Sequence, residues 1–378
     1  MDFALNDQQE LLKKEARRFF DGEFPKKLVL QLQESELGYS PEIWRKMADL
    51  GWLGLVIPEE YGGAGATLLD LGVLFEEVGK SACPSPLFAT MAFGVLPLLD
   101  AGNEEQKHRL LPRVASGDLI LTMALSEPEA DYQPKFMTTR AQQKDGRFCI
   151  TGTKLFVPYA HVADVMLVVA ATSPVDDDGK GTTVFLVPKE AKGIGQVPLK
   201  TVGRDKQFEM TFNSVQVSPS DTLGAVNGGW PVVDITLQKA TAIQCVETVG
   251  VMQQELAMTA EYTSKRVQFG RPIGSFQAVQ HRLADTLTDV EGARWLAYRA
   301  LSHLGNGLPA QREVAIAKAW VSDACQRVAY SAQHLHGGIG MDLDYDLHFY
   351  FEWAKARQLS LGPAPYHLAF IEPTIRSS

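Results

Sequence analysis

The chain has 378 residues, which is long enough for two or three domains and excludes a small module that needs disulfides or metals to fold. Hydrophobic residues make up 45% and charged residues 21%, as in folded globular proteins, so a disordered chain is excluded. The formal net charge of -9 disfavours nucleic acid or an anionic membrane surface as a general partner.

The pattern from the N-terminus to residue 118 is helical. Asn6 and Asn103 are each followed three residues later by Gln, which is the signature of a capping box at a helix start. Ser40 stands before a proline and predicts another helix start, and Gly51 predicts the end of that helix. We expect residues 1–118 to form an N-terminal helical domain.

Between residues 119 and 222 the chain changes to short runs rich in β-branched and aromatic residues, separated by polar turns. The predicted strands are LILTMAL, RFCITG, KLFV, DVMLVVAAT, TTVFLVP and QFEMTFNSVQV. We expect residues 119–222 to form a middle β domain, either a barrel or a sandwich.

From Trp230 onward long helical patterns return, with breaks only at 269–274, 305–309 and 337–340. Long helices joined by short loops are typical of an antiparallel four-helix bundle, which we expect over residues 223–378. The predicted fold class is therefore α+β with three domains.

Cysteine spacing and apolar runs predict the compartment. The four cysteines lie far apart with no CxxC pair, which favours reduced thiols over a disulfide or zinc framework. The first twelve residues are unlike a signal peptide, and no apolar run approaches the length of a membrane span. We expect a cytoplasmic protein with no membrane partner.

The sequence contains only weak candidates for nucleotide-binding and metal-binding motifs. No GxGxxG follows a predicted strand, which disfavours a Rossmann nucleotide site. His334 and His336 lie two residues apart, so on a helix they face different directions, and no third ligand lies nearby. We predict no metal site and interpret both histidines as core or hydrogen-bonding residues.

Several strings, in their order and spacing, resemble the acyl-CoA dehydrogenase family over nearly the whole chain. They are WLGLVIPEEYGGAG at 52–65, LSEPEA at 125–130, GTKLFVPYAHVADVMLV at 152–168, RVQFGRPIGSFQAVQHRLAD at 266–285 and HLHGGIGMDLDYDLHFY at 334–350. The resemblance implies a flavoprotein that oxidises the α,β carbon pair of an acyl-CoA thioester, in which a carboxylate removes the α proton and FAD accepts the β hydrogen as hydride. It further implies a tetramer with FAD across a subunit interface and an electron-transferring flavoprotein as oxidant.

The resemblance assigns the adenine and pyrophosphate end of FAD to an R-x-x-F-G motif, present here as Arg266, Gln268 and Phe269. A guanidinium can meet pyrophosphate oxygens, and an aromatic ring can pack on adenine. Other matching positions are Gln277, Gly337, Gly338 and His334, the last standing where Gln is usual. We call these seven residues the adenine half-site. The alternative is that Arg266 only complements a helix C-terminus and the glycines only end a helix.

The flavin ring is assigned by the same resemblance to Leu125, Ser126 and Phe156, which we call the flavin half-site. Leu125 and Ser126 match a strand that faces the pyrimidine edge of the ring. Phe156 stands where Trp usually stacks on the flavin and keeps a flat apolar surface. Pro158 replaces a Thr whose hydroxyl and amide serve flavin N5, and proline offers neither donor.

The usual catalytic base is missing. The family's E-G-T string is Leu361, Gly362 and Pro363 here, and the alternative Glu position on an earlier helix is Ala240. Neither Leu nor Ala can accept a proton. Glu247 lies seven residues after Ala240, about 10 Å along the same helix face, and is a weak candidate for the base, although an ion-paired or solvated Glu is the commoner state. Asp234 is a further candidate.

Two more departures concern the acyl-CoA. Thr241 stands where the family often has Arg, and the G-S-D string that helps to seat pantetheine is replaced by Asp131, Tyr132 and Gln133. Both changes weaken the predicted recognition of the acyl-CoA thioester.

Three functions stay open at this stage. In the first, the chain is the base-lacking subunit of a heterotetrameric acyl-CoA dehydrogenase, paired with a different chain that bears the catalytic Glu and a flavin half-site of its own. Alternatively, it is a self-sufficient FAD homotetramer with a non-standard base or a non-standard chemistry on an unusual acyl-CoA. A third possibility is a non-enzymatic member retained for assembly or for binding CoA esters.

Overall fold

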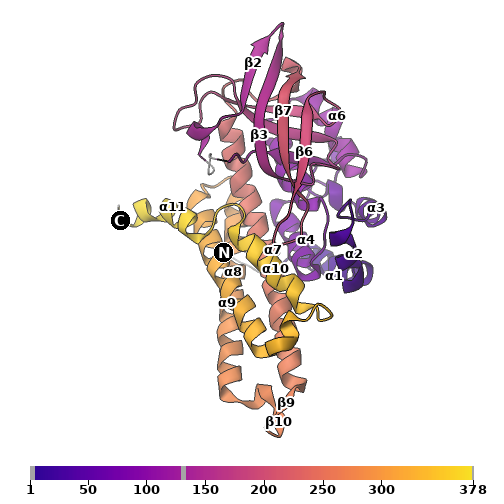
Figure 1. Ribbon diagram of the computed structural model, residues 1–378, viewed down its shortest axis with the longest axis vertical. Coiled ribbons are helices and arrows are strands. Elements are labelled where there is room, and N and C mark those ends of the chain that lie inside the picture. Colours follow the sequence, from indigo (N-terminus) through magenta and orange to yellow (C-terminus); the bar gives the residue numbers. More distant parts are fainter. Residues whose placement is uncertain (1–4, 129–132, 377–378) are drawn as a thin grey trace. The chain divides into compact units, whose positions relative to one another are not determined.

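The computed structural model describes residues 5–128 and 133–376, with side chains as far as residue 371. Helices come first along the chain, a β-sheet follows, and long helices return in the C-terminal part (Figure 1). This order confirms the predicted fold class of a helical, a β and a second helical domain.

The N-terminal helices begin where the capping signatures predict. Asn6 and Asn103 each accept from the backbone N–H three residues on, and the Gln at that position accepts in turn from the cap residue's N–H. Ser40 caps its helix through Ile43 N. The helices are α1 (Asp7–Glu23), α2 (Lys26–Glu34), α3 (Pro41–Asp49), α4 (Leu68–Ser81), the π-helix η3 (Ala89–Val95), α5 (Leu96–Ala101) and α6 (Glu104–Ala115).

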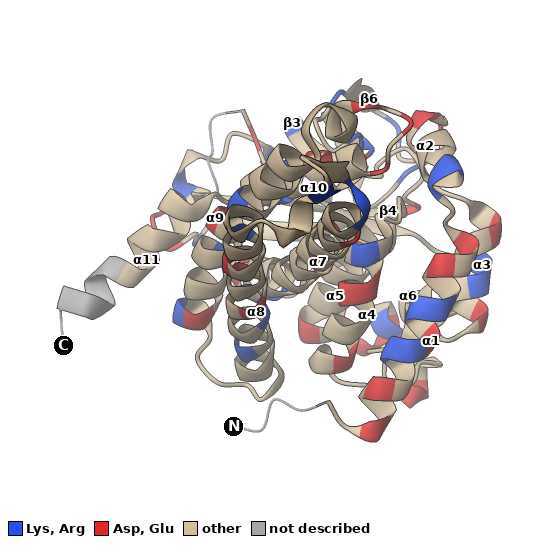
Figure 2. Ribbon diagram, turned by 90° about the horizontal axis from the view of Figure 1, so that it is seen from below, with Lys and Arg blue, Asp and Glu red and all other residues tan. Residues whose placement is uncertain are grey.

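Helix α1 is amphipathic. Ala16 and Phe20, four residues apart, are both buried on one face of the helix. Basic and acidic residues are interspersed along its exposed side (Figure 2), where Arg18 pairs with Glu15 at 2.9 Å. Such an exposed pair adds little to stability, so the apolar face contributes more to the docking of the helix than this pair does.

The middle region forms one eight-stranded sheet. Its order is β6-β7-β3-β2-β4-β5-β8, and β1 pairs in parallel with β4. The strands are β1 (Leu121–Ala124), β2 (Arg140–Lys144), β3 (Arg147–Pro158), β4 (Val165–Ala171), β5 (Thr182–Pro188), β6 (Ile194–Leu199), β7 (Gln207–Val217) and β8 (Thr222–Leu223). One face of the sheet buries a core of apolar side chains that includes Phe148, Val168 and Phe185.

The predicted strands at RFCITG and KLFV are a single strand, β3, so their separation was wrong. A β-bulge between Lys154 and Val157 interrupts the alternation of buried and exposed residues and divides the pattern without ending the strand. Strands β2 and β6 were missed because β2 is almost entirely polar and β6 has no fully buried residue.

Five α-helices make up the described C-terminal region, and the three predicted breaks fall at connections between them, whereas the connection at 360–363 was not predicted. They are α7 (Trp230–Lys265), α8 (Gln277–Gly305), α9 (Gln311–His336), α10 (Leu347–Leu359) and α11 (Ala364–Arg376). The short strands β9 (Val267–Gln268) and β10 (Arg271–Pro272) form a hairpin between α7 and α8, and the 3-10 helix η7 (Gly337–Met341) follows α9.

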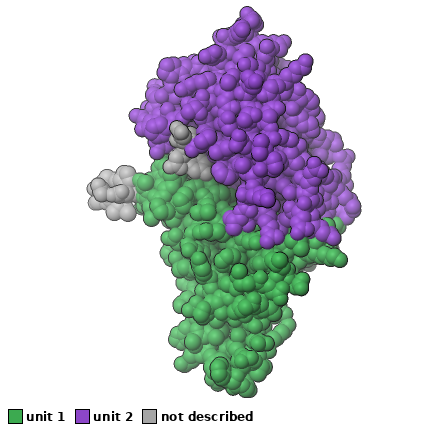
Figure 3. Space-filling view, viewed as in Figure 1, with its two compact units in different colours: residues 1–30, 67–83, 241–378 green, residues 31–66, 84–240 purple. Residues whose placement is uncertain are grey.

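Contacts divide the chain into two compact units, each assembled from separated segments (Figure 3). Unit 1 comprises residues 1–30, 67–83 and 241–378, and unit 2 comprises residues 31–66 and 84–240. In unit 1, helices α4 and α7 pack with their backbones in contact, because a Cβ at Gly79 would lie 1.9 Å from the carbonyl oxygen of Glu247. A side chain at Gly79 would therefore force the two helices apart.

The described helices include none that is long and apolar enough to cross a membrane. The four cysteines, Cys83, Cys149, Cys245 and Cys325, are free thiols.

Candidate functional site

The predicted cofactor-binding residues fall into two groups that belong to different units. The flavin half-site lies in unit 2, at the end of β1 and on β3. The adenine half-site lies in unit 1, on the hairpin after α7 and at the end of α9.

In unit 2, two hydrogen bonds fasten the chain at the end of β1 to the end of β3. The N–H of Leu155 donates to Ser126 O at 2.8 Å, and the Thr122 hydroxyl donates to Pro158 O at 2.6 Å. Leu125 and Ser126 themselves are half-buried. The two elements that carry the flavin half-site therefore form one connected piece of backbone.

A buried ion pair lies under this connection and was not predicted from the sequence. Lys154 Nζ donates to Leu125 O at 2.9 Å and to Glu127 Oε1 at 2.7 Å, and the two side chains are 0% and 1% exposed. Glu127 also accepts from the N–H and hydroxyl of Thr138 at 2.6 Å each and from the N–H of Thr139 at 3.1 Å. Each buried charge thus has at least two hydrogen-bond partners, which offset the cost of its burial.

Burial and the ion pair together shift the pKa of both Lys154 and Glu127. Burial lowers the pKa of Lys154 to about 8, against the raising effect of the Glu127 carboxylate. Burial raises the pKa of Glu127, but Lys154 and the two threonines outweigh it and lower that pKa to about 2. Glu127 is therefore a permanent anion at neutral pH and not a proton acceptor.

Phe156 occupies the bulge of β3. Its φ is +53°, in the left-handed region that a bulky residue rarely adopts, and its side chain is 58% exposed. Bulges commonly redirect a side chain near functional sites. The bulge thus presents a flat aromatic ring to the outside of unit 2. Two residues on, Pro158 has no N–H to offer.

The predicted pantetheine contact lies partly outside the described residues. Asp131 and Tyr132 belong to the undescribed stretch, whereas Gln133 is exposed and precedes the 3-10 helix η4 (Pro134–Phe136).

In unit 1, the adenine half-site residues Gln268 and Phe269 lie on an exposed hairpin. Gln268 pairs with Arg271, so Phe269 and Gly270 form a two-residue loop in which both φ values are positive, +53° and +79°. This is the requirement of a type I′ turn, which usually selects Asn or Gly at its first central position. Phe269 takes that position instead, and its side chain is 92% exposed.

Arg266 connects helix α7 to this hairpin. Its N–H donates to Tyr262 O and its carbonyl accepts from Ile273 N, both at 2.8 Å. Within the described part of the chain, the Arg266 guanidinium has neither an ion-pair nor a hydrogen-bond partner, so its charge is available to an anion. A pocket of about 490 Å³ lies beside it, lined by Lys26, Gln254, Met258, Glu261, Tyr262, Lys265, Arg266, Tyr345 and Asp346.

The remaining adenine half-site residues are exposed. They are His334, Gly337, Gly338 and Gln277. Gln277 opens α8 after a short 3-10 helix, η6 (Ile273–Ser275), that follows the hairpin, and Gly337, with φ +66°, turns the chain out of α9. An aromatic contact links the two regions, because the ring of Tyr262 stacks on that of His336 at a centroid distance of 4.5 Å.

The positions of the usual base hold no proton acceptor. Leu361 is half-buried at the turn after α10, with φ +56°, and its carbonyl accepts from His367 Nε2–H at 2.8 Å. Ala240 is completely buried on α7. Burial lowers the pKa of His367 to about 4, so this neighbouring imidazole is a weak base.

Glu247, the weak candidate for the base, is 1% exposed and accepts from the Arg357 guanidinium at 3.0 Å. The guanidinium thus holds this carboxylate in an ion pair within unit 1. Asp234 is half-buried and accepts from Gln238 Nε2 at 2.7 Å, and Thr241 is buried.

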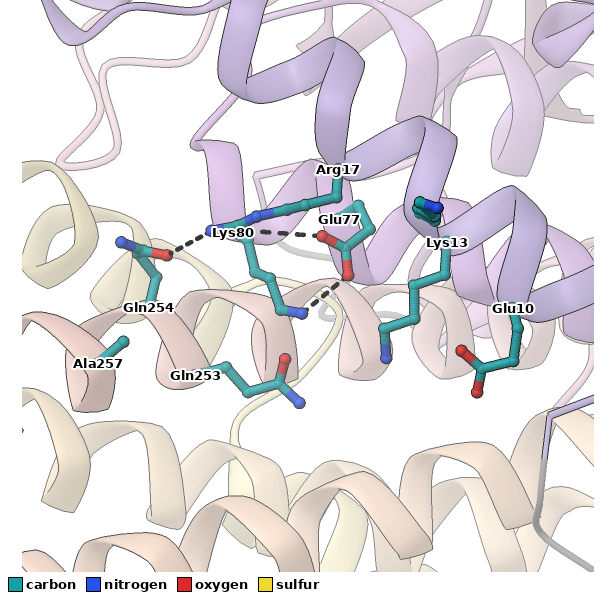
Figure 4. A pocket seen from close by; sticks show the side chains of 9 residues that line it. Glu10, Lys13, Arg17, Glu77, Lys80, Gln253, Gln254 and Ala257 are labelled. Atoms are coloured by element: carbon teal, nitrogen blue, oxygen red, sulfur yellow. Dashed lines mark hydrogen bonds and ion pairs between the residues drawn. The ribbon is translucent and has the colours of Figure 1, made fainter.

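A second pocket in unit 1, between α1, α4 and α7, is crowded with charge (Figure 4). Two of its cations point to one carboxylate of the same pocket: Arg17 lies 3.6 Å from Glu77, and Lys80 lies 2.8 Å from the same side chain. Lys13 pairs with the fully buried Glu76 at 2.8 Å. Three of the four cations that line the pocket are thus paired with carboxylates, which lowers its attraction for an anion.

Comparison with known proteins decides the family. Three models match the chain in order: acyl-CoA dehydrogenase, N-terminal domain, over residues 6–118, the middle domain over residues 122–215, and the C-terminal domain over residues 227–375. This chain belongs to the acyl-CoA dehydrogenase family. Members of the acyl-CoA dehydrogenase family are oxidoreductases that use FAD.

Individual acyl-CoA dehydrogenases resemble the chain over most of its length. The acyl-CoA dehydrogenase FadE27 of Mycobacterium tuberculosis is 33% identical over 342 residues, which are 88% of each chain. The ChsE4-ChsE5 complex from Mycobacterium tuberculosis has a TM-score of 0.91 at 31% identity and full coverage of both chains. A variant of the Tcur3481-Tcur3483 steroid acyl-CoA dehydrogenase has a TM-score of 0.88 at 33% identity, covering 98% of each chain.

The residues present fit the two ends of FAD unequally. An exposed ring and an unpaired guanidinium suit adenine and pyrophosphate, and Arg266 and Phe269 provide both. For the flavin ring, Ser126 and Phe156 offer a polar group and a flat surface, but Pro158 removes a donor. The described residues contain no group of three side chains that could hold a metal ion.

Proposed function

We propose that this chain is the base-lacking subunit of a heterotetrameric acyl-CoA dehydrogenase. In such an assembly it provides the adenine half-site for FAD held by a partner chain, and the partner supplies the carboxylate that removes the α proton of the acyl-CoA thioester. FAD, when bound, accepts the hydride. The observation that carries the proposal is the contrast between Leu361 and Ala240, which cannot take a proton, and the exposed Arg266 and Phe269.

The first support is that no substitute base stands at the expected positions. Glu247 is committed to Arg357, and the imidazole of His367 donates to Leu361 O with its pKa lowered to about 4 by burial. A general base for the α proton works best when its pKa lies near the operating pH. We therefore assign Glu247 to packing of the bundle and His367 to the turn at Leu361.

The second support is the exposure of Phe269. Phe269 is 92% exposed at a strained φ of +53°, and its edge-on contact with Phe276, at a centroid distance of 6.2 Å, leaves most of the ring uncovered by its own unit. A ligand that covers the ring would explain why the hairpin keeps it there. Adenine of a FAD whose flavin end belongs to another protomer would cover it, and that places the FAD across a subunit interface.

The third support comes from the relatives, because two of the solved structures most similar to this chain are described as pairs of different chains, ChsE4-ChsE5 and Tcur3481-Tcur3483. The second is called a steroid acyl-CoA dehydrogenase. We therefore propose a CoA ester of a steroid acid as the first substrate to test, with butyryl-CoA as the short-chain comparison and an electron-transferring flavoprotein as oxidant.

The test is the flavin absorbance of the purified protein. We expect the chain alone to be colourless, and to be yellow when co-expressed with a second acyl-CoA dehydrogenase chain of the same genome that has Glu at the position of Leu361. The yellow complex should bleach with an acyl-CoA. A yellow homotetramer of this chain alone that bleaches with an acyl-CoA would overturn the proposal.

A matched pair of variants locates the contribution of this chain. Arg266→Gln in the co-expressed complex should lower FAD content, whereas Arg271→Gln, five residues on in the same hairpin, should lower it less, because Arg271 stacks on Phe276 at 4.1 Å. Equal FAD content in the complexes of the wild type, Arg266→Gln and Arg271→Gln would show that Arg266 does not contact the cofactor.

A further inference from the structure

Two elements of the adenine half-site are joined by an aromatic cluster that nothing in the sequence motifs assigned. The cluster consists of Tyr262 on α7, His336 at the end of α9 and Tyr345 before α10. Tyr262 stacks on His336 at 4.5 Å with 24° between the ring planes, and its ring meets that of Tyr345 edge-on at 6.4 Å. His336 is only 4% exposed, so the stack is part of the interior of unit 1.

The hydrogen bonds of His336 fix its tautomer. Nδ1 lies 2.8 Å from Ala332 O, and a carbonyl can only accept, so Nδ1 carries the hydrogen. Nε2 then accepts from the Tyr345 hydroxyl at 3.0 Å. Burial lowers the pKa of His336, which keeps the ring neutral and the arrangement intact near pH 7.

Each member of the cluster is tied to a predicted contact of FAD. Tyr262 O accepts the N–H of Arg266, one helical turn on. His336 stands directly before Gly337, whose φ of +66° and ψ of -140° are open only to glycine, so the direction of the chain at Gly337 is set from His336 onward. Tyr345 closes the segment that contains Gly337 and Gly338, because its hydroxyl returns to His336 nine residues earlier.

We propose that His336 is a positioning residue for the adenine half-site: its stack on Tyr262 and its hydrogen bond to Tyr345 set the spacing between Arg266 and the Gly337–Gly338 turn. This inference rests on the proposed function, because it assumes that these elements bind the adenine end of FAD. His336 itself touches no ligand. Its contribution is to hold two separate stretches of chain in a fixed position relative to each other.

The experiment measures ADP binding to the full chain by calorimetry, and FAD release from the co-expressed complex by flavin fluorescence, alongside the thermal midpoint of each variant. His336→Ala removes both the stack and the bond and should weaken binding about tenfold. Tyr345→Phe removes one hydroxyl, and His336→Phe keeps the ring without the bond. Both should weaken binding about threefold.

Tyr298→Phe is the matched control. It also removes one hydroxyl from unit 1, where the Tyr298 hydroxyl donates to the buried Glu76 at 2.8 Å, and Tyr298 makes no contact with the cluster. We expect Tyr298→Phe to lower the thermal midpoint as Tyr345→Phe does, with ADP and FAD binding unchanged. Such a difference separates positioning from general destabilisation.

Two results would overturn the inference: ADP and FAD affinities of His336→Ala and Tyr345→Phe within twofold of the wild type, or an equal loss of affinity in Tyr298→Phe. Arg266→Gln distinguishes this failure from failure of the proposed function. If Arg266→Gln weakens binding and His336→Ala does not, only the positioning role falls. If neither the chain nor its complex binds ADP or FAD, both fall.

Discussion

The flavin half-site and the adenine half-site each present an aromatic ring, but the two rings are supported in different ways. Each unit presents a phenylalanine at φ +53°, Phe156 in unit 2 and Phe269 in unit 1. Phe156 projects from a bulge in a central strand next to a buried ion pair, whereas Phe269 sits at the tip of a two-residue turn and is 92% exposed. A ring built into a sheet is positioned by its own unit, and a ring at a hairpin tip needs a second body to cover it.

This difference predicts which substitutions destabilise each unit. In unit 2, the buried ion pair of Lys154 and Glu127 supports the flavin half-site, so removing one of the two charges should destabilise the fold. In unit 1, orientation comes from aromatic contacts and a turn, so the hairpin can be altered with little loss of stability. Substitutions in each unit test that distinction.

Lys154→Met should lower the free energy of unfolding by about 3–5 kcal/mol, because Glu127 then stays buried without its cation. Lys154→Met combined with Glu127→Met should recover most of that loss. Urea unfolding followed by circular dichroism measures both. A loss below 1 kcal/mol in the single variant would show that unit 2 does not rely on the pair.

The same pair has a pH signature. The pKa of Glu127 is about 2 when folded, against an unfolded value of 4.5, so its contribution to stability is complete above about pH 4.5 and is lost as the pH falls through 2. The double variant should lack this acid-dependent loss.

Glu247→Gln should reduce stability by about 1–3 kcal/mol, because the charge-assisted bond from Arg357 is weakened. The rate at which an acyl-CoA bleaches the flavin of the heteromeric complex should not change. Stopped-flow absorbance gives this rate. A hundredfold fall in the bleaching rate with unchanged stability would make Glu247 the base after all.

Glu255→Met should stabilise unit 1 at neutral pH. Both carboxyl oxygens of Glu255 are buried with no hydrogen-bond partner in the described chain, and burial raises its pKa well above 4.5. The folded state keeps a proton that the unfolded chain releases above about pH 4.5, so wild-type stability falls as the pH rises from there, by at most about 1.4 kcal/mol per pH unit. Urea midpoints of both proteins between pH 4 and 8 should diverge accordingly, and parallel curves would contradict the assignment.

Phe269→Gly should stabilise the chain by about 1 kcal/mol, because glycine adopts a positive φ without strain, while the co-expressed complex loses FAD. Phe156→Gly should relieve the same strain but also remove the flat surface in unit 2. Thermal midpoints and flavin content report the two effects. Loss of stability in Phe269→Gly would mean that the ring packs within unit 1.

Local signals predicted much of the fold. The caps at Asn6, Ser40 and Asn103 are hydrogen bonds between residues three apart, so the sequence alone specifies them. Strand β6 is different, because none of its residues is fully buried, and its pairing with β7 leaves no periodic apolar pattern to detect.

The site was predicted less completely for a related reason. Arg266 and Phe269 belong to a contiguous motif, but the importance of Lys154 depends on Glu127, 27 residues away, and on the burial that folding imposes on both. Lysine and glutamate are usually exposed, so the sequence does not indicate that Lys154 and Glu127 form a buried pair. Likewise, nothing in the spacing of Tyr262, His336 and Tyr345 indicates that their rings meet.

The division of unit 1 into separated segments has a consequence for synthesis on the ribosome. Residues 1–30 emerge first and meet α4, within residues 67–83, soon afterwards, but the third segment of the unit begins only at residue 241, about 160 residues after α4. At about 5–20 residues per second, α1 and α4 wait about 8–30 s for the helices that complete the unit. During that interval the nascent chain exposes a helix pair that needs protection, so yield in the cell should depend on chaperones that capture early N-terminal segments.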